Sequence, residues 1–118
     1  MNKLPWMVLA MVIGFNNLSS RAAELDVPVF MWAKGDLEIC SPATIRGPAA
    51  VRAGPGNGHR AIDEIGAGER VWILDNNKGW FGVVYGIGRV DCAPIGNDRP
   101  YDGPGKSGWV NGDFIESQ

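Results

Sequence analysis

Short apolar segments separated by glycine-rich turns follow one another from residue 49 to the end of the chain. Short strands at such regular spacing are typical of a small barrel or sandwich. No ten-residue stretch after residue 23 shows helical periodicity. The pattern predicts an all-β fold, and a barrel of five to six strands is the economical arrangement for a region this short. The expected strands are residues 49–53, 62–65, 69–74, 80–85, 109–110 and 114–115.

The third expected strand divides its side chains between two faces. Val71 and Ile73 share one face and Trp72 lies on the other, because successive side chains of a strand point in opposite directions. If the first face lines the core, Trp72 points outward and needs a cover, either from the N-terminal residues around Trp32 or from a partner. Residues 75–79 predict a hairpin turn, since asparagine and glycine tolerate positive φ.

Two irregular segments flank these strands. Residues 86–106 are rich in glycine and proline and predict a long insert before the last strands. Residues 27–32 are apolar but interrupted by Pro28, which fits either an extra edge strand or an arm lying on the domain. We therefore expect an N-terminal arm over residues 23–43 and the folded domain over residues 44–116.

The first 22 residues have the layout of a secretory signal peptide. Lys3 precedes an apolar run of 12 residues at 4–15, and a polar, small-residue stretch follows. As a helix the run would span about 18 Å, short of the ~30 Å hydrocarbon core, which disfavours a permanent anchor. We expect cleavage after Ala22 and an exported, periplasmic or secreted protein with no membrane attachment after cleavage. An uncleaved anchor or a buried N-terminal helix is the alternative.

Composition limits what the exported chain would bind. Glycine and proline account for 25 of the 118 residues, which excludes long helices and coiled coils. The formal charge of −2 becomes −4 once residues 1–22, with Lys3 and Arg21, are removed. The chain has no basic footprint for nucleic acid. Four tryptophans remain after cleavage and indicate a folded domain.

Export makes the two cysteines interpretable. In an oxidising compartment Cys40 and Cys92 form an even pair with one possible connectivity. The bridge would enclose 52 residues, and loop-closure entropy would give it about 4 kcal/mol of stability. Free or metal-binding thiols are the alternative, which is weaker because the single histidine, His59, is near neither cysteine in sequence. No metal ion or other cofactor is expected.

Catalytic residues are sparse. A nucleophilic triad needs a serine or cysteine beside a histidine and a carboxylate, whereas His59 lies in a glycine-rich loop. Asp63 and Glu64 are adjacent and would face opposite sides of a strand, which argues against a cooperating acid and base. Residues 54–58 contain Pro55 and lead to no helix, unlike a phosphate-binding loop. We expect that the protein is not an enzyme.

Four separated motifs occur in a recognisable order. They are Val-Arg-Ala-Gly-Pro-Gly at 51–56, Ile-Asp-Glu-Ile at 62–65 with Gly68, Gly-Trp-Phe-Gly-Val-Val-Tyr at 79–85, and Ser-Gly-Trp-Val at 107–110 followed by Phe114 and Ile115. Together they resemble the bacterial SH3 (SH3b, SH3 type 3) domain family, and the likeness covers roughly residues 44–116. The resemblance implies an SH3-like barrel of five to six short strands, preceded here by the signal-peptide helix.

A narrower resemblance is to exported, single-domain proteobacterial members with one cysteine before the first strand and another in the long insert. Many such members carry a second cysteine pair, at positions held here by Leu74 and Gly105. Both partners are absent together, which leaves Cys40 to pair with Cys92. The resemblance implies a non-enzymatic envelope module that binds cell-wall peptide (peptidoglycan) or an envelope protein. A structural or regulatory protein-interaction domain of a periplasmic or secreted complex is the alternative.

SH3-like barrels present a groove lined by aromatic and a few polar side chains. Trp80 and Trp109 are favoured as core residues, with the groove as the alternative, and Tyr101 in the insert is the aromatic residue that we most expect to be exposed. The candidate ligand-binding residues are Arg52, His59, Trp72, Trp80, Phe81, Tyr85, Tyr101 and Trp109.

Overall fold

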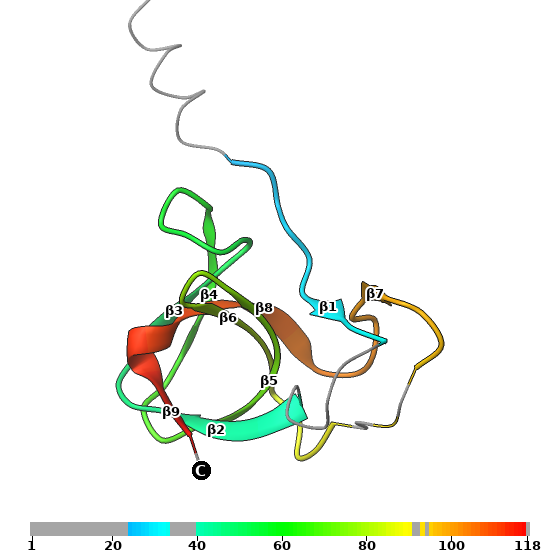
Figure 1. The fold of residues 1–118 in the computed structure, drawn as a ribbon. Coiled ribbons are helices and arrows are strands. Elements are labelled where there is room, and N and C mark those ends of the chain that lie inside the picture. The colour runs from blue at the N-terminus through cyan, green and yellow to red at the C-terminus, as the bar shows by residue number, and fades with distance from the viewer. Residues whose placement is uncertain (1–23, 34–39, 91–92, 94, 118) are drawn as a thin grey trace, which may run out of the picture.

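Seven antiparallel strands form one sheet that curls into a barrel (Figure 1). The computed structural model describes residues 24–33, 40–90, 93 and 95–117, so the expected signal peptide and Cys92 lie outside the described residues. The strand order is β4-β3-β8-β6-β5-β2-β9, which confirms the all-β prediction. These strands are β2 (Ser41–Ile45), β3 (Ala49–Arg52), β4 (Ala61–Ile65), β5 (Arg70–Asn77), β6 (Trp80–Tyr85), β8 (Lys106–Asn111) and β9 (Ile115–Ser117).

The sheet has seven strands rather than five or six, and the one that the prediction lacks is β2. It starts at Ser41, inside the segment predicted to be the arm, so the barrel begins before residue 44. Pro42 conceals this strand, since proline cannot donate to a ladder. It is tolerated because β9 pairs only with residues 43–45, which leaves Pro42 with β5 as its single neighbour.

The hairpin between β5 and β6 is tighter than predicted. Residues 75–77 are paired strand and not turn. Asn77 pairs with Trp80, and Lys78 and Gly79 alone reverse the chain, with φ values of 51° and 88°. Two successive positive φ values are what a two-residue type I′ turn requires. The expectation that asparagine supplies the positive φ is wrong, because Lys78 does.

Side chains alternate between two apolar clusters on the two faces of the curled sheet. On β5, Val71 belongs to the cluster inside the barrel and Ile73 packs against it. Leu74 belongs to the cluster on the outer face, against which Trp72 packs, so the division expected for this strand is confirmed. The inner cluster is Ala43, Ile45, Ala49, Val51, Ile65, Val71, Val83, Tyr85, Val110 and Ile115. The outer cluster is Val29, Leu74, Val84, Val90 and Trp109.

Residues 24–33 form an arm that lies along the outside of the barrel (Figure 1). Within it, β1 (Phe30–Met31) pairs with β7 (Arg99–Pro100) of the long insert as a separate two-stranded sheet. The sequence allowed two structures for this segment, and the segment combines them. It is an arm that lies on the domain, and it contains a short extra strand. The arm supplies Val29 to the outer cluster, and the insert supplies Val90.

The chain closes with a single turn of 3-10 helix, η2 (Gly112–Phe114), followed by β9. The side chain of Asn111 caps this turn by accepting a hydrogen bond from the Asp113 amide (2.9 Å). The tight turn predicted at residues 111–113 is therefore present, and the closing strand starts one residue later than expected.

Candidate functional site

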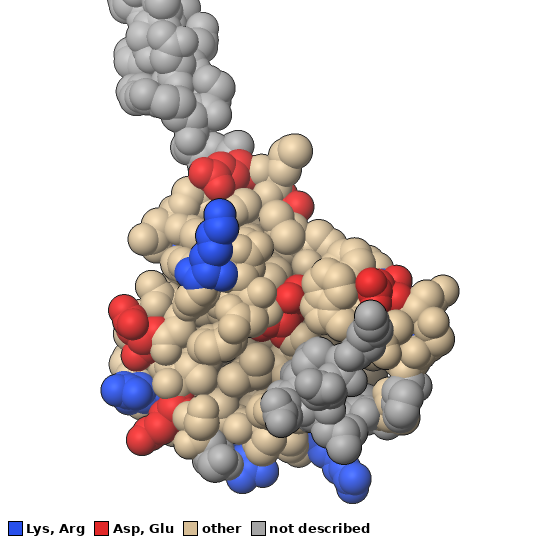
Figure 2. Space-filling model, viewed as in Figure 1, with Lys and Arg blue, Asp and Glu red and all other residues tan. Residues whose placement is uncertain are grey.

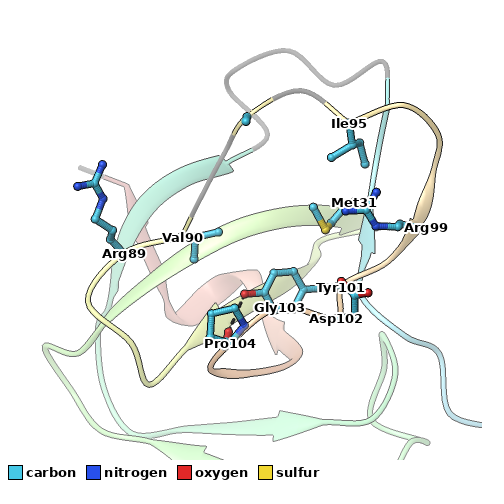
Figure 3. Close-up of a pocket in the computed structure, with 10 residues that line it drawn as sticks. Met31, Arg89, Val90, Ile95, Arg99, Tyr101, Asp102, Gly103 and Pro104 are labelled. Atoms are coloured by element: carbon cyan, nitrogen blue, oxygen red, sulfur yellow. Dashed lines mark hydrogen bonds between the residues drawn. The ribbon is translucent and has the colours of Figure 1, made fainter.

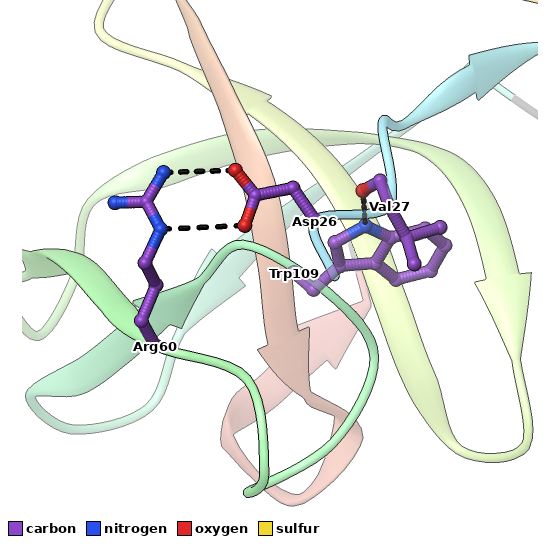
Figure 4. Close-up of polar contacts among 4 residues, drawn as sticks. All are labelled: Asp26, Val27, Arg60 and Trp109. Carbon is purple, nitrogen blue, oxygen red and sulfur yellow. Dashed lines mark hydrogen bonds and ion pairs between the residues drawn. The ribbon is translucent and has the colours of Figure 1, made fainter. Parts of the chain in front are cut away.

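The arm is held on the barrel by main-chain and ring contacts near its middle. The Val27 amide donates to the Ala53 carbonyl at 2.8 Å, and the Trp109 indole Nε1–H donates to the Val27 carbonyl at 2.7 Å (Figure 4). Two residues further on, the Val29 carbonyl accepts from the Tyr101 amide at 2.8 Å. With the arm in this place the predicted candidate Trp109 is only 1% exposed, so it contacts the arm and not solvent.

Gly82 on β6 makes room for the arm residue Val29, which is 2% exposed. A Cβ atom at Gly82 would lie 2.9 Å from a Val29 methyl carbon and 2.9 Å from the Asp75 Cβ, closer than carbon atoms pack in proteins. Glycine inside an otherwise apolar strand marks a place where another segment approaches closely. Here the segment that approaches is the arm.

An ion pair and a carboxylate–imidazole contact fasten the start of the arm to the loop between β3 and β4. The Arg60 guanidinium donates to both carboxylate oxygens of Asp26, with N···O distances of 2.9 and 3.3 Å (Figure 4). This hydrogen bonding lowers the pKa of Asp26 and raises that of Arg60. The Glu24 carboxylate lies 3.1 Å from the Nε2 of His59. The Arg60–Asp26 pair is exposed on both sides and is of the kind that contributes to orientation more than to stability.

Two predicted candidates, Arg52 and His59, meet in this same loop. The Arg52 guanidinium donates to the His59 carbonyl at 2.9 Å. The imidazole side chain is 10% exposed and lies on Gly54, where any Cβ atom would collide with the ring. Its buried Nδ1 has no hydrogen-bond partner among the described residues. These contacts give Arg52 and His59 a role in shaping the loop that receives the arm.

The predicted candidates Trp72 and Trp80 are half-buried on the outer face and pack against the outer cluster. The Arg70 guanidinium lies over the Trp72 ring, 5.8 Å from its centroid. Trp32 donates its indole N–H to Asp75 at 3.0 Å and is 41% exposed. Trp72 thus obtains its cover from the outer cluster, to which the arm contributes. Phe81 points the other way and packs against the inner cluster.

Tyr85 belongs to the inner cluster, against which Phe81 also packs. Its hydroxyl donates to the Asp63 carboxylate at 2.8 Å, and the Lys106 ammonium lies 3.5 Å from the same oxygen. Burial first, and the bond to Asp63 second, raise the pKa of Tyr85. The Glu64 amide and the Tyr85 hydroxyl lower the pKa of Asp63. Tyr85 and Asp63 form a structural contact at the edge of the barrel.

A pocket of about 640 Å³ lies between the arm and the insert. Four apolar side chains converge on it, and these are Met31, Val90, Ile95 and Tyr101 (Figure 3). Arg99 lies beside Met31 and Asp102 beside the tyrosine, whereas Arg89 lies at the opposite side with its guanidinium directed outward in this view (Figure 3). The pocket therefore combines an apolar wall with Arg99 and Asp102 at its rim and with Arg89 at its outer edge.

Tyr101 is the one predicted candidate that lines this pocket. Its hydroxyl donates to the Pro104 carbonyl at 2.6 Å, and burial, with a smaller contribution from Asp102, raises its pKa. The hydroxyl is therefore neutral and already bonded, so the side chain offers its ring to the pocket. Tyr101, which was expected to be exposed, is half-buried, and Trp32 is the most exposed aromatic side chain among the described residues.

Sequence reasoning did not find Arg89, Arg99 or the contact of Asp26 with Arg60. The insert has no hydrophobic periodicity from which the lining of a pocket could be predicted. Its strand β7 is only two residues long and contains Pro100. The available signal was the pair of arginines placed around short apolar residues in the insert. For the contact between the arm and the barrel, the signal in the sequence was Gly82, the isolated glycine of β6.

Other kinds of site are not evident in the described part of the chain. No group of three or more His, Cys, Asp or Glu side chains there is placed to hold a metal ion. None of its helical segments has both the length and the apolar character needed to span a membrane. Figure 2 shows acidic and basic side chains interspersed over one face, without a patch of a single sign. The pairing of Cys40 with Cys92 stays a prediction.

Comparison of the chain with protein-family models, curated proteins and solved structures finds no match. The likeness to the bacterial SH3 family therefore stays a prediction from the sequence motifs. A functional assignment has to come from the geometry of the arm, the insert and the pocket between them.

Proposed function

We propose that the protein is an exported, non-enzymatic SH3b-type binding module of the bacterial envelope, and that it binds cell-wall peptide in the pocket between the arm and the insert. The pocket is the observation that carries the proposal. Its volume of about 640 Å³ falls in the range of small-ligand sites, which are mostly apolar with a few converging polar groups.

The charged groups around the pocket suit a short peptide that carries free carboxylates. Arg89 and Arg99 offer planar guanidinium groups, which bind carboxylates in a bidentate manner. Asp102 offers an acceptor for an amine of the same ligand. The ring of Tyr101 and the side chain of Met31 supply apolar surface for short side chains between these charged groups.

The surroundings of the single histidine favour binding over catalysis. His59 is wedged on Gly54 and pairs with Glu24 through Nε2. Both contacts are structural, and no serine is bonded to the ring in the described residues. Hydrolysis of the proposed ligand therefore has no general base with a nucleophile beside it.

Sedimentation with purified sacculi tests the proposal. The protein is expected to sediment with the sacculi, and the Arg89→Glu and Arg99→Glu variants are each expected to lose about tenfold in apparent affinity. Each variant replaces a carboxylate-binding group by a repelling one. Arg46→Glu is the matched control, because Arg46 is exposed and does not line the pocket. Circular dichroism verifies that all variants are folded.

Two results would count against the proposal in different ways. Equal sedimentation of the pocket variants and the Arg46→Glu control would contradict the site. Failure of every protein to sediment would contradict the cell-wall ligand and favour an envelope protein as the partner.

A further inference from the structure

The arm fills most of a groove on the outside of the barrel. We define the arm groove by the residues that receive the arm, namely Ala53, Arg60, Gly82, Tyr101 and Trp109. We propose that the arm groove is a binding site for an extended segment of a partner protein, and that the arm of this chain is its tethered occupant. This site adjoins the pocket proposed above for cell-wall peptide and shares Tyr101 with it.

Three hydrogen bonds of the arm groove are made to the main chain of its occupant. The Ala53 carbonyl accepts from Val27, and the Trp109 indole and the Tyr101 amide donate to the carbonyls of Val27 and Val29. Main-chain contacts of this kind hold an extended peptide whatever its side chains, as in recognition by strand addition. The groove is therefore built to receive extended backbone.

The remaining contacts select side chains. Arg60 takes the Asp26 carboxylate through both oxygens (Figure 4). The hollow above Gly82 takes Val29 and buries it to 2% exposure. Pro28 lies between them, and its fixed φ keeps the segment extended at low entropic cost. These contacts favour a segment that contains, in sequence order, an acidic residue, an aliphatic residue, a proline and an aliphatic residue.

The barrel does not need the arm to complete its interior. None of the inner cluster residues comes from the arm, since the cluster runs from Ala43 to Ile115. The side-chain contacts that hold the ends of the arm lie at the surface: Trp32 donates to Asp75, the Ala33 amide donates to Asp98, and Arg60 pairs with Asp26. These features allow the arm to leave the groove while the barrel remains folded.

The arm also leaves part of the groove empty. Open space of about 280 Å³ lies beside arm residues 26–29, and Ile62 and Gly108 border it on the barrel side. Val27 faces this space and remains 37% exposed, while Ile62 remains 41% exposed. A segment with a larger aliphatic residue at the position of Val27 would bury more apolar surface than the arm does. The groove therefore accepts a better occupant than the one it holds.

Because the arm is tethered to the barrel, a partner segment needs a minimum affinity for the arm groove to displace it. A short tether gives the arm an effective concentration in the millimolar range. A partner segment must therefore bind the open groove more tightly than the arm to displace it. A segment that matches the order above and fills the space beside Val27 meets this requirement.

The experiment uses the full chain with a specific protease site introduced between residues 34 and 39. Cutting there removes the tether and leaves both cysteines on the barrel fragment. A fluorescein-labelled peptide with the sequence of residues 24–33 is then added, and fluorescence anisotropy measures its binding. Circular dichroism of the same samples reports whether the barrel stays folded.

The labelled peptide is expected to exchange into the cut protein, which stays folded. The Val29→Asp peptide should bind at least about tenfold more weakly, since it would bury an unpaired charge. The Asp26→Ala peptide should bind about two- to fivefold more weakly, and an Arg60→Ala barrel should abolish this difference. The Val27→Leu peptide should bind about fourfold more tightly, because it buries one more CH₂ group.

Each of three results would overturn the proposal. These are unfolding of the barrel once the arm leaves, no exchange of the labelled peptide, and equal affinity of the native and Val29→Asp peptides. Dimers of the uncut chain that free peptide dissociates would also overturn it, since the occupant would then be the arm of a second copy. Peptide exchange in an Arg89→Glu protein separates this site from the pocket, because sacculus binding alone depends on Arg89.

Discussion

Lys78 adopts a backbone conformation that its side chain disfavours. It is the one non-glycine residue with positive φ in the described part of the chain, at 51°. The left-handed conformation costs an L-residue roughly 1–2 kcal/mol. The two-residue reversal between β5 and β6 imposes it, because Gly79 follows with φ of 88° and Asn77 is already paired with Trp80.

Replacing Lys78 by a residue that tolerates this conformation should stabilise the domain. We expect Lys78→Asn to raise the free energy of unfolding by about 0.5–1 kcal/mol, measured by urea denaturation. Lys78→Ala is the control, since alanine retains the cost of positive φ. Equal stabilisation by the two substitutions would show that the lysine side chain, and not the backbone, is responsible.

The carboxylate of Asp63 should contribute a pH-dependent part of the stability. Its pKa lies below the ordinary value of 3.8, because the Glu64 amide, the Tyr85 hydroxyl and Lys106 favour the charged form. The folded protein therefore holds the proton less tightly than the unfolded chain. The resulting stability is present above the ordinary pKa and is lost as the pH falls through the lowered one.

The Asp63→Asn variant removes this contribution. The difference in free energy of unfolding between the native protein and the variant should shrink as the pH falls from about 6 to about 3. Urea midpoints at several pH values measure it, with Asp113→Asn as the control at an exposed carboxylate of η2. A difference that stays constant over this range would contradict the assignment.

At the scale of elements, the packing of the arm on β6 depends on one missing side chain. Trp80, Gly82 and Val84 share the outward face of that strand, and the flanking side chains contact the outer cluster. Val29 occupies the space that a side chain at Gly82 would take. The side chain of Val29 on the arm therefore fits into the space that Gly82 leaves on β6.

A double-mutant cycle should detect this match. Val29→Ala is expected to lower the free energy of unfolding by about 1–2 kcal/mol through lost burial, and Gly82→Ala by about 1–3 kcal/mol through overpacking. In the double variant the smaller alanine at position 29 relieves the part of the overpacking that involves Val29, while the close contact with the Asp75 Cβ remains. The combined loss, measured by urea denaturation, should therefore be smaller than the sum. Strict additivity would mean that the two residues do not pack on each other.

The strands were predictable where local pattern decides them. β6 has the predicted bounds, and β3 and β4 differ by one residue, because apolar alternation and bordering glycines define all three. β2 was hidden by Pro42, whose tolerance depends on which strands lie beside it. The same holds for β7, where Pro100 lies opposite Phe30 of the arm.

The candidate sites depend on contacts that no local pattern contains. The pocket joins Met31 of the arm to Val90 and Tyr101 of the insert. The arm groove joins Val27 to Trp109, which are 82 residues apart. Sequence reasoning proposed the aromatic residues as candidates for ligand binding and favoured only Trp80 and Trp109 as core residues. It had no means of placing the arm over them.

At the scale of the whole molecule, the domain has two layers with different roles. The inner cluster consists mainly of valine, isoleucine and alanine and closes the barrel. The outer layer, made by the arm and the insert, holds the larger rings and both candidate sites. Changes in the outer layer should therefore affect binding more than the integrity of the barrel.

The predicted Cys40–Cys92 disulfide would link the start of the barrel covalently to the insert. Cys40 packs against the outer cluster immediately before β2, and residue 92 belongs to the insert. Removing the bridge would free the insert and increase the entropy of the unfolded chain, with an expected loss of about 4 kcal/mol in the free energy of unfolding. Sacculus binding should weaken as well, because Arg89 and Arg99 would no longer be held on opposite sides of one pocket.

A Cys40→Ala/Cys92→Ala variant and the reduced native protein should therefore show the same loss of stability and of sacculus binding. Urea denaturation with and without reductant measures the first, and sedimentation measures the second. Alkylation followed by intact-mass measurement provides the control, since native protein should take up alkyl groups only after reduction. Two thiols that alkylate in the unreduced native protein would contradict the bridge. A variant that loses stability but binds sacculi normally would show that the bridge supports the barrel and not the pocket.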